Sequence, residues 1–585
     1  MAATEVLSFH HGGAGCAVAP GRQTELVYVA LSSGPGGLIL VSTLDERGDP
    51  VGEPQTVGAA MLPAAVAQLE VGHPRWVWDD TRRWYAPLLA AGVRMERCVD
   101  LRLAHTILRN SELTASSALA RAQPSSWDSG PVEVEQRSAG DALFEFEVTE
   151  KPAEEDPLEE FRMQRRAVES AAESGRIGLL LAAESAGALV AAEIQFAGLP
   201  WRADLHDALL TGTLGSRPLP GQRPRLLSEA LDRVRAALDA PDLNPDSPAE
   251  LLKSLSNAGI MATSTRSWEL KKIEHPAITP LLEYKKLARL LGANGWHWLD
   301  ANVRNGRFYP DYVPGGVVTG RWASKGGGGA LQLPKQIRAA VVADDGWKFV
   351  VADASQLEPR ILAALSGDSG MAEAGRSKDM YAAIVESGAV ATRAQAKVAM
   401  LGAMYGATTG ESGRLMPKLT RAYPKAIALV EQAARAGERG KIVTTRLGRS
   451  SPHPSEQWRV AQDDAYGEGA TDAEQKRARG QARSWGRFTR NFVVQGSAAE
   501  WALCWMAILR QKLHELSGMA WLTDVPHLVL FMHDELVVHC PADATAGVEL
   551  AVRDAAAQAG RLMFGDAPVE FPLTVAIVDN YGQAK

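Results

Sequence analysis

The sequence has little cysteine, and its arrangement indicates neither a metal site nor a disulfide framework. Its 585 residues include only four cysteines, Cys16, Cys98, Cys504 and Cys540. They are scattered and form no Cys-x-x-Cys pair, so we expect reduced thiols. The chain also lacks a basic-plus-apolar leader and a stretch of 18 apolar residues. We therefore expect a cytoplasmic protein without a membrane span.

The chain as a whole lacks the positive charge that would indicate a nucleic-acid partner, because its net charge is −7. The charge is uneven, however. Residues 391–491 hold 18 Lys and Arg against 9 Asp and Glu, whereas residues 132–160 are strongly acidic. Such asymmetry is typical of a polyanion-binding half joined to an acidic segment. The length predicts several domains.

Two carboxylates interrupt the apolar run "VLFMHDELVVH", residues 529–539. We predict a buried strand here, and an unpaired ionised carboxylate in a dry interior costs on the order of tens of kcal/mol. Asp534 therefore requires a neutralising partner. A second acid, Asp353, ends the apolar run "GWKFVVADAS" 181 positions earlier. A lone acid at a strand end is commonly structural or solvated, but two could share a pair of magnesium ions, which suit phosphoryl transfer.

Between the two acids, "TRAQAKVAMLGAMYGATTG" (392–410) predicts a helix with a basic stripe. The stripe repeats every fourth residue: Arg393, Lys397, Leu401 and Tyr405. The like charges of Arg393 and Lys397 at this spacing repel each other and destabilise the helix slightly, whereas a triphosphate bound along the helix would make their closeness favourable. A solvated basic face is the alternative. Gly402, Gly406 and Gly410 share the spacing and predict a face that something approaches closely.

Other segments carry local signals. Helices are expected around 82–91, 99–109 and 278–292. In "LNPDSPAELLKSL" (243–255), Ser247, Pro248 and Glu250 predict a helix start with a capping box. The polar residues 451–480 indicate a surface insertion.

These motifs resemble, in order, those of family A DNA polymerases. Asp353 with "SQLEPR", the Arg-x3-Lys-x7-Tyr-Gly helix and "HDELVV" are similar to the three polymerase motifs. "TGRWAS" (319–324) with "LQLP" (331–334), "RFTRNFVVQGSAAE" (487–500) and "NPDSPAELL" resemble further family segments. The resemblance covers about residues 200–585.

The resemblance implies roles for individual residues. Asp353 and Asp534 would hold two Mg²⁺ ions, with Mn²⁺ as a possible substitute and Glu535 in support. Lys397 would be catalytic, protonating the departing pyrophosphate. The incoming nucleotide would be bound by Arg393, Lys397, Leu401, Tyr405, Gln356 and the sugar-discriminating Glu358. DNA would be bound by Arg321, Gln332, Arg487, Asn491, Gln495 and His533.

The implied fold is multidomain α/β, a right-hand polymerase preceded by a ribonuclease-H-like domain. We expect an exonuclease-like domain at 1–205, a thumb at 206–300, palm at 301–370, fingers at 371–485 and palm again at 486–585. The implied protein is a monomeric, nucleoid-associated DNA polymerase that takes primer-template DNA and dNTPs, in repair or replication gap filling. We expect it to lack a 5′ nuclease.

Two departures from the family pattern stand out. Leu401 replaces a common aromatic residue, which predicts looser discrimination against ribonucleotides. "VWDDTRRWYAPLLAAGVRMERCVDLRLAHTIL" (77–108) resembles a proofreading exonuclease region, but it places Trp84 where a metal-binding Asp is expected and Asp80 where Asn is expected. No Asp-x-Glu occurs in residues 1–50, and "MQRRAVESAAES" replaces the later Tyr-x3-Asp.

We therefore expect no proofreading. Two alternatives remain: a polymerase with a residual 3′–5′ exonuclease, and a non-catalytic DNA-binding scaffold. Retention of the acids and of the basic stripe argues against the scaffold.

Overall fold

The computed structural model describes residues 28–129, 156–325, 331, 333–407, 410–465, 467, 470–518 and 520–584. The chain divides into two compact units. Unit 1 comprises residues 1–197, 312–323 and 352–575, and unit 2 comprises residues 198–311, 324–351 and 576–585. Cys98, Cys504 and Cys540 are buried free thiols. Cys16, Gln332 and most of the acidic segment lie outside the described residues.

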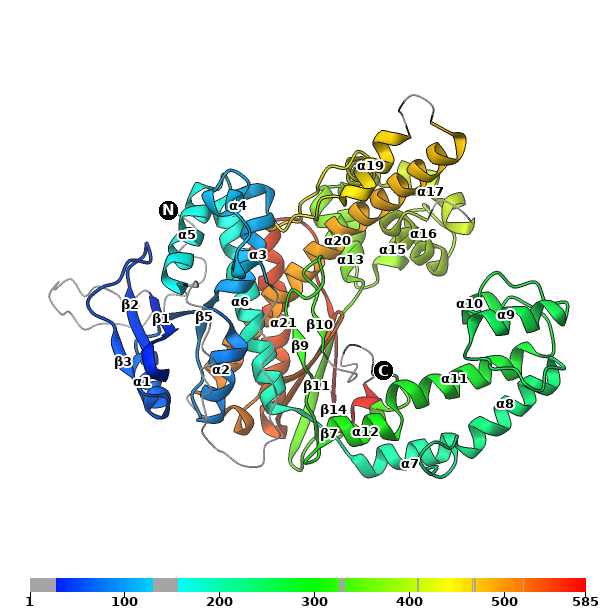
Figure 1. The fold of residues 1–585 in the computed structure, drawn as a ribbon, viewed down its shortest axis with the longest axis horizontal. Coiled ribbons are helices and arrows are strands. Elements are labelled where there is room, and N and C mark those ends of the chain that lie inside the picture. Colours follow the sequence, from blue (N-terminus) through cyan, green and yellow to red (C-terminus); the bar gives the residue numbers. More distant parts are fainter. Residues whose placement is uncertain are drawn as a thin grey trace. The chain divides into compact units, whose positions relative to one another are not determined.

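Unit 1 contains a five-stranded sheet in the order β3-β2-β1-β4-β5 (Figure 1). Its strands are β1 (Tyr28–Ser33), β2 (Ile39–Leu44), β3 (Gln55–Val57), β4 (Arg75–Trp78) and β5 (Arg97–Asp100). Strand β1 runs antiparallel to β2 and parallel to β4, and β4 is parallel to β5. Strands β1 and β4 form because their apolar residues can be buried on both faces of the sheet.

Two helices lie between strands of this sheet in the chain, α1 (Leu62–Glu70) and α2 (Thr81–Ala90). Three more come after its last strand: α3 (Leu101–Asn110), α4 (Ala118–Arg121) and α5 (Pro157–Ser170). Helices α2 and α3 confirm the two expected near residues 82–91 and 99–109. Each begins at an acid that caps it: Asp80 accepts a hydrogen bond from the Arg82 amide, and Asp100 accepts one from the Leu103 amide.

Among the described residues, two helices are long and apolar enough to cross a membrane: α6 (Ser174–Ala197) and α20 (Asp472–Ser517), both in unit 1. Their most apolar 18-residue windows are 72% and 83% buried within the protein. Both are therefore core helices. Helix α20 packs against α6, α18 (Pro424–Glu438) and α21 (Thr545–Phe564).

A second sheet has the order β12-β13-β11-β14. Its strands are β11 (Trp347–Ala354), β12 (His527–Met532), β13 (Glu535–Pro541) and β14 (Leu573–Val578). Strands β12 and β13 form an antiparallel hairpin in which Met532 pairs with Glu535. Two residues, His533 and Asp534, therefore make the turn, and His533 adopts the left-handed conformation with φ of 61°.

Between these strands the chain is helical: α13 (Leu357–Ser366), α14 (Ser369–Arg376), α15 (Met380–Glu386), α16 (Arg393–Tyr405), α17 (Gly410–Ala422), α18 and α19 (Glu456–Asp464). The interpretation of residues 451–480 as a surface insertion was incomplete, because α19 and the first turns of α20 form there. The Thr471 side chain and Glu474 cap α20 reciprocally.

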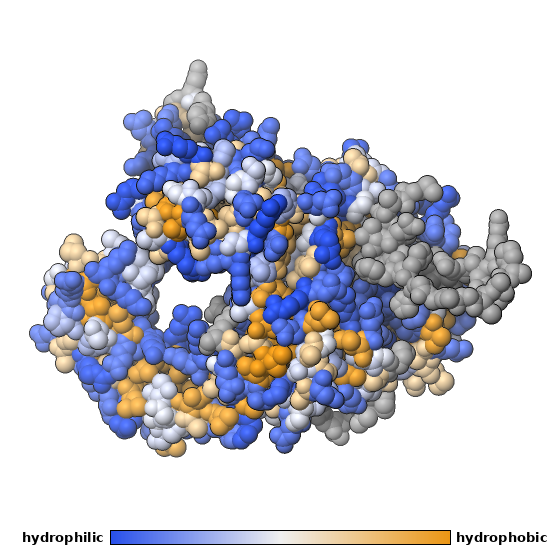
Figure 2. Space-filling view, turned by 180° about the vertical axis from the view of Figure 1, so that it is seen from behind, coloured by the Kyte–Doolittle hydropathy of each residue, from blue (hydrophilic) through white to orange (hydrophobic). Residues whose placement is uncertain are grey.

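Unit 2 is mainly helical: α7 (Ala203–Leu214), α8 (Arg225–Ala237), α9 (Pro248–Asn257), α10 (Ser267–Leu270), α11 (Ile278–Asn294) and α12 (Trp296–Asn302). Three two-residue strands, β6 (Leu199–Pro200), β7 (Val303–Arg304) and β8 (Arg307–Phe308), form a small sheet. A further two-residue strand in unit 1, β9 (Tyr312–Val313), pairs with β10 (Ala323–Ser324). Unit 2 exposes apolar residues among charged ones (Figure 2). They include Leu219 and Met261 in loops and Trp268 in α10.

The start of α9 shows where local patterning failed. Ser247 caps the helix as predicted and accepts a hydrogen bond from the Glu250 amide. The predicted return bond from Glu250 to Ser247 is absent among the described contacts, because the Glu250 carboxylate instead accepts from the amide of Asn244 at 3.3 Å. The capping box was therefore half right.

A buried ion pair joins α20 to the N-terminal part of unit 1. Arg510 on α20 donates to both carboxylate oxygens of Glu193 on α6, at 3.0 and 2.7 Å. It also donates to the main-chain carbonyls of Met95 and Glu96 and to the Tyr85 hydroxyl. Burial alone would raise the pKa of Glu193, but the charges of Arg510 and Arg94 and the hydrogen bonds from Arg510 and Tyr85 together outweigh it and lower that pKa to about 2.

We predict that Arg510→Met lowers the free energy of unfolding by about 3–5 kcal/mol, because it leaves the Glu193 carboxylate buried without its main cation. Chemical denaturation measures the change. The matched control is Arg225→Met, which removes the ion pair with Glu229, where the side chains are 68% and 46% exposed. That change should cost at most about 1 kcal/mol. Equal effects of the two substitutions would contradict the prediction.

Candidate active site

The structure brings Asp353 and Asp534 together from distant parts of the chain. Asp353 is the penultimate residue of β11, and β11 lies beside β13. The amide of Ala354, the next residue, donates a 2.9 Å hydrogen bond to the main-chain carbonyl of Asp534. The two acids therefore lie at the same end of neighbouring strands, both partly exposed.

The expectation that Asp534 is buried in a strand was wrong. Strand β12 ends at Met532, and Asp534 lies in the hairpin turn, where its side chain reaches solvent. The buried acid is Glu535, the first residue of β13, which is 2% exposed. The apolar pattern could not distinguish one uninterrupted strand from two strands with a two-residue turn.

The acids form a plausible site for hydrated magnesium on chemical grounds. Mg²⁺ prefers oxygen ligands, retains several waters and is commonly held by one or two carboxylates together with substrate phosphates. Asp353 and Asp534 meet that requirement. Within the described residues, no group of three or more His, Cys, Asp or Glu side chains forms an all-protein metal cage. Glu535 is more enclosed than the two aspartates, and its expected supporting role stays a prediction.

Glu358 binds two other predicted site residues, Arg321 and Tyr405. It lies in the first turn of α13, directly after the β11 strand, as expected. Arg321 donates to its carboxylate at 2.6 Å, and the Tyr405 hydroxyl donates to it at 2.9 Å. Burial and then the Glu358 charge raise the pKa of Tyr405 to about 12, so the phenol keeps its proton and donates. Gln495 on α20 contacts the same phenol.

Helix α16 presents the predicted stripe to solvent. Its four members are exposed: Arg393, Lys397, Leu401 and Tyr405. The opposite face, including Ala396, Met400 and Ala403, is buried. The Thr392 side chain caps the helix by accepting from the Gln395 amide. The 3.6-residue period therefore placed this face correctly.

The small-residue face of α16 is occupied by the protein itself. A Cβ atom on Gly402 would lie 1.5 Å from the Ser412 hydroxyl of α17. Gly406 ends α16 in the left-handed conformation, with φ of 73°, and Arg487 packs against it. Gly410 begins α17 with φ of 68°. The prediction of one glycine face was wrong, because only Gly402 is inside the helix.

Arg393 has a carboxylate partner that the sequence analysis missed. Its Nε atom lies 2.7 Å from Asp379, and its guanidinium lies 5.5 Å from the centre of the Tyr381 ring. Gln356, in the left-handed conformation before α13, also donates to Asp379 at 3.0 Å. Burial raises the pKa of Asp379, but these hydrogen bonds outweigh it and lower that pKa. Asp379 caps α15, a signal that could have identified it.

The remaining predicted DNA-binding residues gather near the same place. Arg487, Asn491 and Gln495 follow one another at four-residue spacing on one face of α20; Arg487 is exposed, and the other two are half-buried. His533, in the hairpin turn, is exposed. Burial of the ring and then the charge of Arg321 lower the pKa of His533, so the imidazole is neutral at pH 7.

The acids of the N-terminal sheet have structural partners. Asp79 follows β4 and accepts from Arg83 at 2.9 Å and from the Trp84 indole at 2.6 Å. Arg83 also donates to Ser33, the last residue of β1, at 2.6 Å. A guanidinium therefore lies between the ends of two adjacent parallel strands. Burial and then the charge of Asp80 raise the pKa of Asp100 to about 7, and Asp100 accepts from the Thr81 amide and hydroxyl.

Comparisons with known proteins agree with these motifs. The family model for DNA polymerase family A matches residues 227–583. Thermostable DNA polymerase I of Thermus thermophilus is 28% identical over 351 residues, 54% of this chain and 38% of that protein. DNA polymerase I of Chloroflexus aurantiacus is 28% identical over 343 residues, 53% of this chain and 33% of that protein. The chain thus covers well under half the length of these relatives.

Among solved structures, the POL domain of Pol1 from M. smegmatis, in complex with DNA primer-template and dNTP, matches 95% of both chains. The TM-score is 0.63 and the sequence identity 17%, a likeness that establishes a shared fold. The mixed α/β multidomain fold expected from the sequence is therefore confirmed.

Proposed function

Because the chain belongs to DNA polymerase family A, we propose that it is a template-directed DNA polymerase that adds deoxynucleotides to a primer 3′ end. The observation that carries the proposal is the convergence of Asp353 and Asp534 beside the exposed basic stripe of α16. Polymerases named among the relatives support the same activity. Gap filling in repair or replication is the proposed setting, in the cytoplasm at the nucleoid.

The proposed chemistry is phosphoryl transfer, which needs positioning and charge neutralisation more than covalent help. Asp353 and Asp534 would hold two Mg²⁺ ions, which stabilise the entering and leaving oxygens when bound. Arg393 and Lys397 would bind the triphosphate along the exposed face of α16. Lys397 would donate a proton to the departing pyrophosphate. Asp379 would hold the Arg393 guanidinium before the nucleotide arrives. On nucleotide binding, Arg393 would give up this ion pair and bind the phosphate instead.

The proposed DNA contacts lie around Glu358. Arg321, Arg487, Asn491 and Gln495 would track the duplex, Gln332 would join them, and the neutral imidazole of His533 would contact the primer end. Phosphate contacts of this kind make binding fall steeply with added salt.

Sugar discrimination would depend on Glu358, which Arg321 and Tyr405 hold in place through hydrogen bonds. Leu401 is 37% exposed on the same helix face as Tyr405. A branched aliphatic side chain covers less of the sugar than a flat aromatic ring would. We therefore propose weaker rejection of ribonucleotides than an aromatic residue at this position would give.

The N-terminal part of unit 1 is proposed to be an exonuclease-like domain without catalysis. The strand order β3-β2-β1-β4-β5, with β1, β4 and β5 parallel, is compatible with a ribonuclease-H-like fold. Strand β1, "YVALSS", carries no acid. Arg83 neutralises Asp79 beside it, and Asp80 and Asp100 cap helices. A cation in this position opposes binding of metal ions, which supports the absence of proofreading.

Primer extension tests the proposed activity. With labelled primer-template, Mg²⁺ and dNTPs, the protein should lengthen the primer, and Asp534→Asn should slow extension by roughly a thousand-fold, because several kcal/mol of transition-state stabilisation are lost. DNA binding should remain. The matched control is Asp543→Asn, an exposed acid beyond β13. DNA binding without extension by the unmodified protein would favour the scaffold alternative.

The sugar proposal predicts that Leu401→Phe raises the preference for dNTPs over rNTPs, because the ring packs against the sugar beside Glu358. Competing dNTP and rNTP incorporation on one template measures the preference. Val398→Phe is the matched control: Val398 is 38% exposed on the same helix but outside the stripe. The same selectivity in the unmodified protein and Leu401→Phe would refute this account.

Loss of proofreading predicts that a labelled primer stays intact with Mg²⁺ and no dNTPs. If shortening is seen, Asp79→Asn and Asp100→Asn separate its sources. Shortening that both substitutions abolish would identify a residual exonuclease in this domain and contradict the proposal. Shortening that neither changes would come from a contaminating nuclease and leave the prediction intact.

A further inference from the structure

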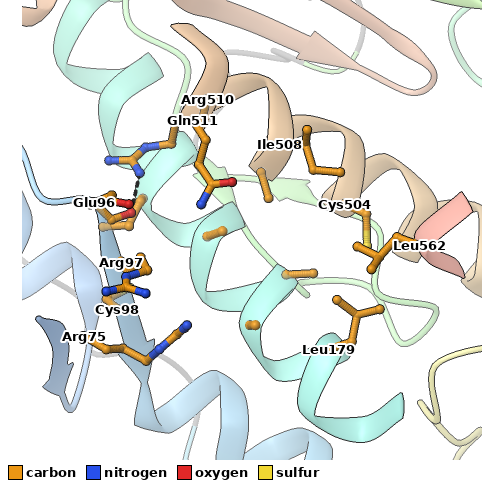
Figure 3. A pocket seen from close by; sticks show the side chains of 15 residues that line it. Arg75, Glu96, Arg97, Cys98, Leu179, Cys504, Ile508, Arg510, Gln511 and Leu562 are labelled. Atoms are coloured by element: carbon orange, nitrogen blue, oxygen red, sulfur yellow. Dashed lines mark hydrogen bonds between the residues drawn. The ribbon is translucent and has the colours of Figure 1, made fainter. Parts of the chain in front are cut away.

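Unit 1 contains a pocket that includes none of the predicted polymerase residues. It lies between strands β4 and β5 on one side and helices α6, α20 and α21 on the other (Figure 3). Its cavity volume is about 40 Å³, and about 540 Å³ when the open space at its mouth is included. A water molecule needs roughly 10–15 Å³ on the first measure, so the cavity itself has room for a small polar group, and a longer ligand would extend through the open mouth. Apart from Arg510 and Gln511 of α20, the helix side is mainly apolar, formed by alanines together with Leu179, Ile508 and Leu562.

The strand side carries two arginines directly opposite each other. Arg75 is the first residue of β4, Arg97 is the first residue of β5, and the two are paired in the parallel register. Figure 3 shows both guanidinium groups on one side of the pocket, across from Ile508 and Leu562. Like charges placed opposite each other on neighbouring strands are destabilising. The arrangement therefore needs a compensating group.

No described carboxylate compensates these charges. The groups that favour the charged form of Arg75 are Tyr28 and Cys98, neither of them a carboxylate, whereas Arg97 and Arg165 oppose it. Within the described part of the chain Arg75 forms no ion pair. Burial and then the Arg97 charge lower the pKa of Arg75. The Arg97 guanidinium donates to the main-chain carbonyl of His73, and its buried Nε has no hydrogen-bond partner among the described residues.

The other charged groups at the pocket are already engaged. Glu96 lies 2.7 Å from the imidazole of His73, and Arg510 is held by Glu193. Glu96 forms its described ion pair with His73, and Arg510 is itself a cation, so neither neutralises the charges of Arg75 and Arg97. Partly buried cations without a carboxylate partner lose hydration and recover only part of that loss, which is the situation that binding of an anion relieves.

We propose that this pocket binds a small amphipathic anion, with its carboxylate or phosphate group between Arg75 and Arg97 and its apolar body against Leu179, Ile508 and Leu562. The site is separate from the degenerate nuclease residues. Arg75 and Arg97 begin β4 and β5, whereas Asp79 and Asp100 lie at the opposite ends of those strands. Because the pocket walls come from the N-terminal sheet and from α20 and α21, the bound anion would stabilise their packing.

Calorimetric titration of the full chain with decanoate and with decyl phosphate tests the site. Binding of either should be weakened roughly 10-fold or more by Arg75→Met and by Arg97→Met, since a hydrogen bond to a charged group contributes about 1.5–3 kcal/mol. The tighter ligand identifies the preferred head group. Decanol binding as tightly as decanoate, or inorganic phosphate binding as tightly as decyl phosphate, would overturn the proposal.

Thermal unfolding provides a readout that a purely structural arginine would not give. Without ligand, Arg75→Met should raise the Tm, because it removes a partly buried charge that faces Arg97. Decanoate should raise the Tm of the unmodified protein and leave that of Arg75→Met nearly unchanged. Arg225→Met should bind decanoate like the unmodified protein. A lower Tm for Arg75→Met in the absence of ligand would show that Arg75 is structural and would overturn the proposal.

Discussion

A main-chain hydrogen bond of 2.9 Å from Ala354 to Asp534 sets the register between β11 and the β12–β13 hairpin. Side chains alternate between the two faces of a sheet, so a slip of one residue would turn Asp353 to the other face. The bond therefore determines whether two acids that are far apart in sequence share a site. The left-handed His533 allows the hairpin to turn in two residues, which places Asp534 at the end of the sheet.

Helix α20 connects this site to the N-terminal sheet. Gln495 on α20 contacts the Tyr405 phenol, and Arg510 on the same helix binds Glu193. The two residues are about four helical turns apart, roughly 22 Å at 1.5 Å per residue. The buried ion pair thus ties the N-terminal part of unit 1 to the helix that carries Gln495. The remaining acids of that N-terminal part cap helices or meet Arg83, which explains how the fold persists without a metal site in the proposed account.

The sequence predicted those parts of the site that depend on periodicity and strand pattern. The exposed stripe of α16, the β11 strand that leads to Asp353, and the Ser247 cap of α9 follow from local rules. Family motifs located Glu358 and Tyr405, whose hydrogen bond the structure then supplied. These features could be predicted because each depends on residues a few positions apart or on a motif that is recognisable in the sequence.

Features that depend on tertiary contacts were missed. Asp379 meets Arg393 only because α15 and α16 pack together, and Ser412 fills the space at Gly402 only because α17 folds back. The turn at Asp534 was hidden because the apolar run continues on both sides of it. The pairing of Arg75 with Arg97 could not be inferred either, since it requires the register of two parallel strands.

The central claim is that Asp353 and Asp534 jointly hold divalent ions where a nucleotide is joined to a primer. Electron paramagnetic resonance titration with Mn²⁺, in the presence of primer-template and dNTP, counts those ions directly. The account predicts two protein-dependent Mn²⁺ ions, both lost when Asp353 and Asp534 are changed together to asparagine. Unchanged Mn²⁺ binding in that double variant would contradict it.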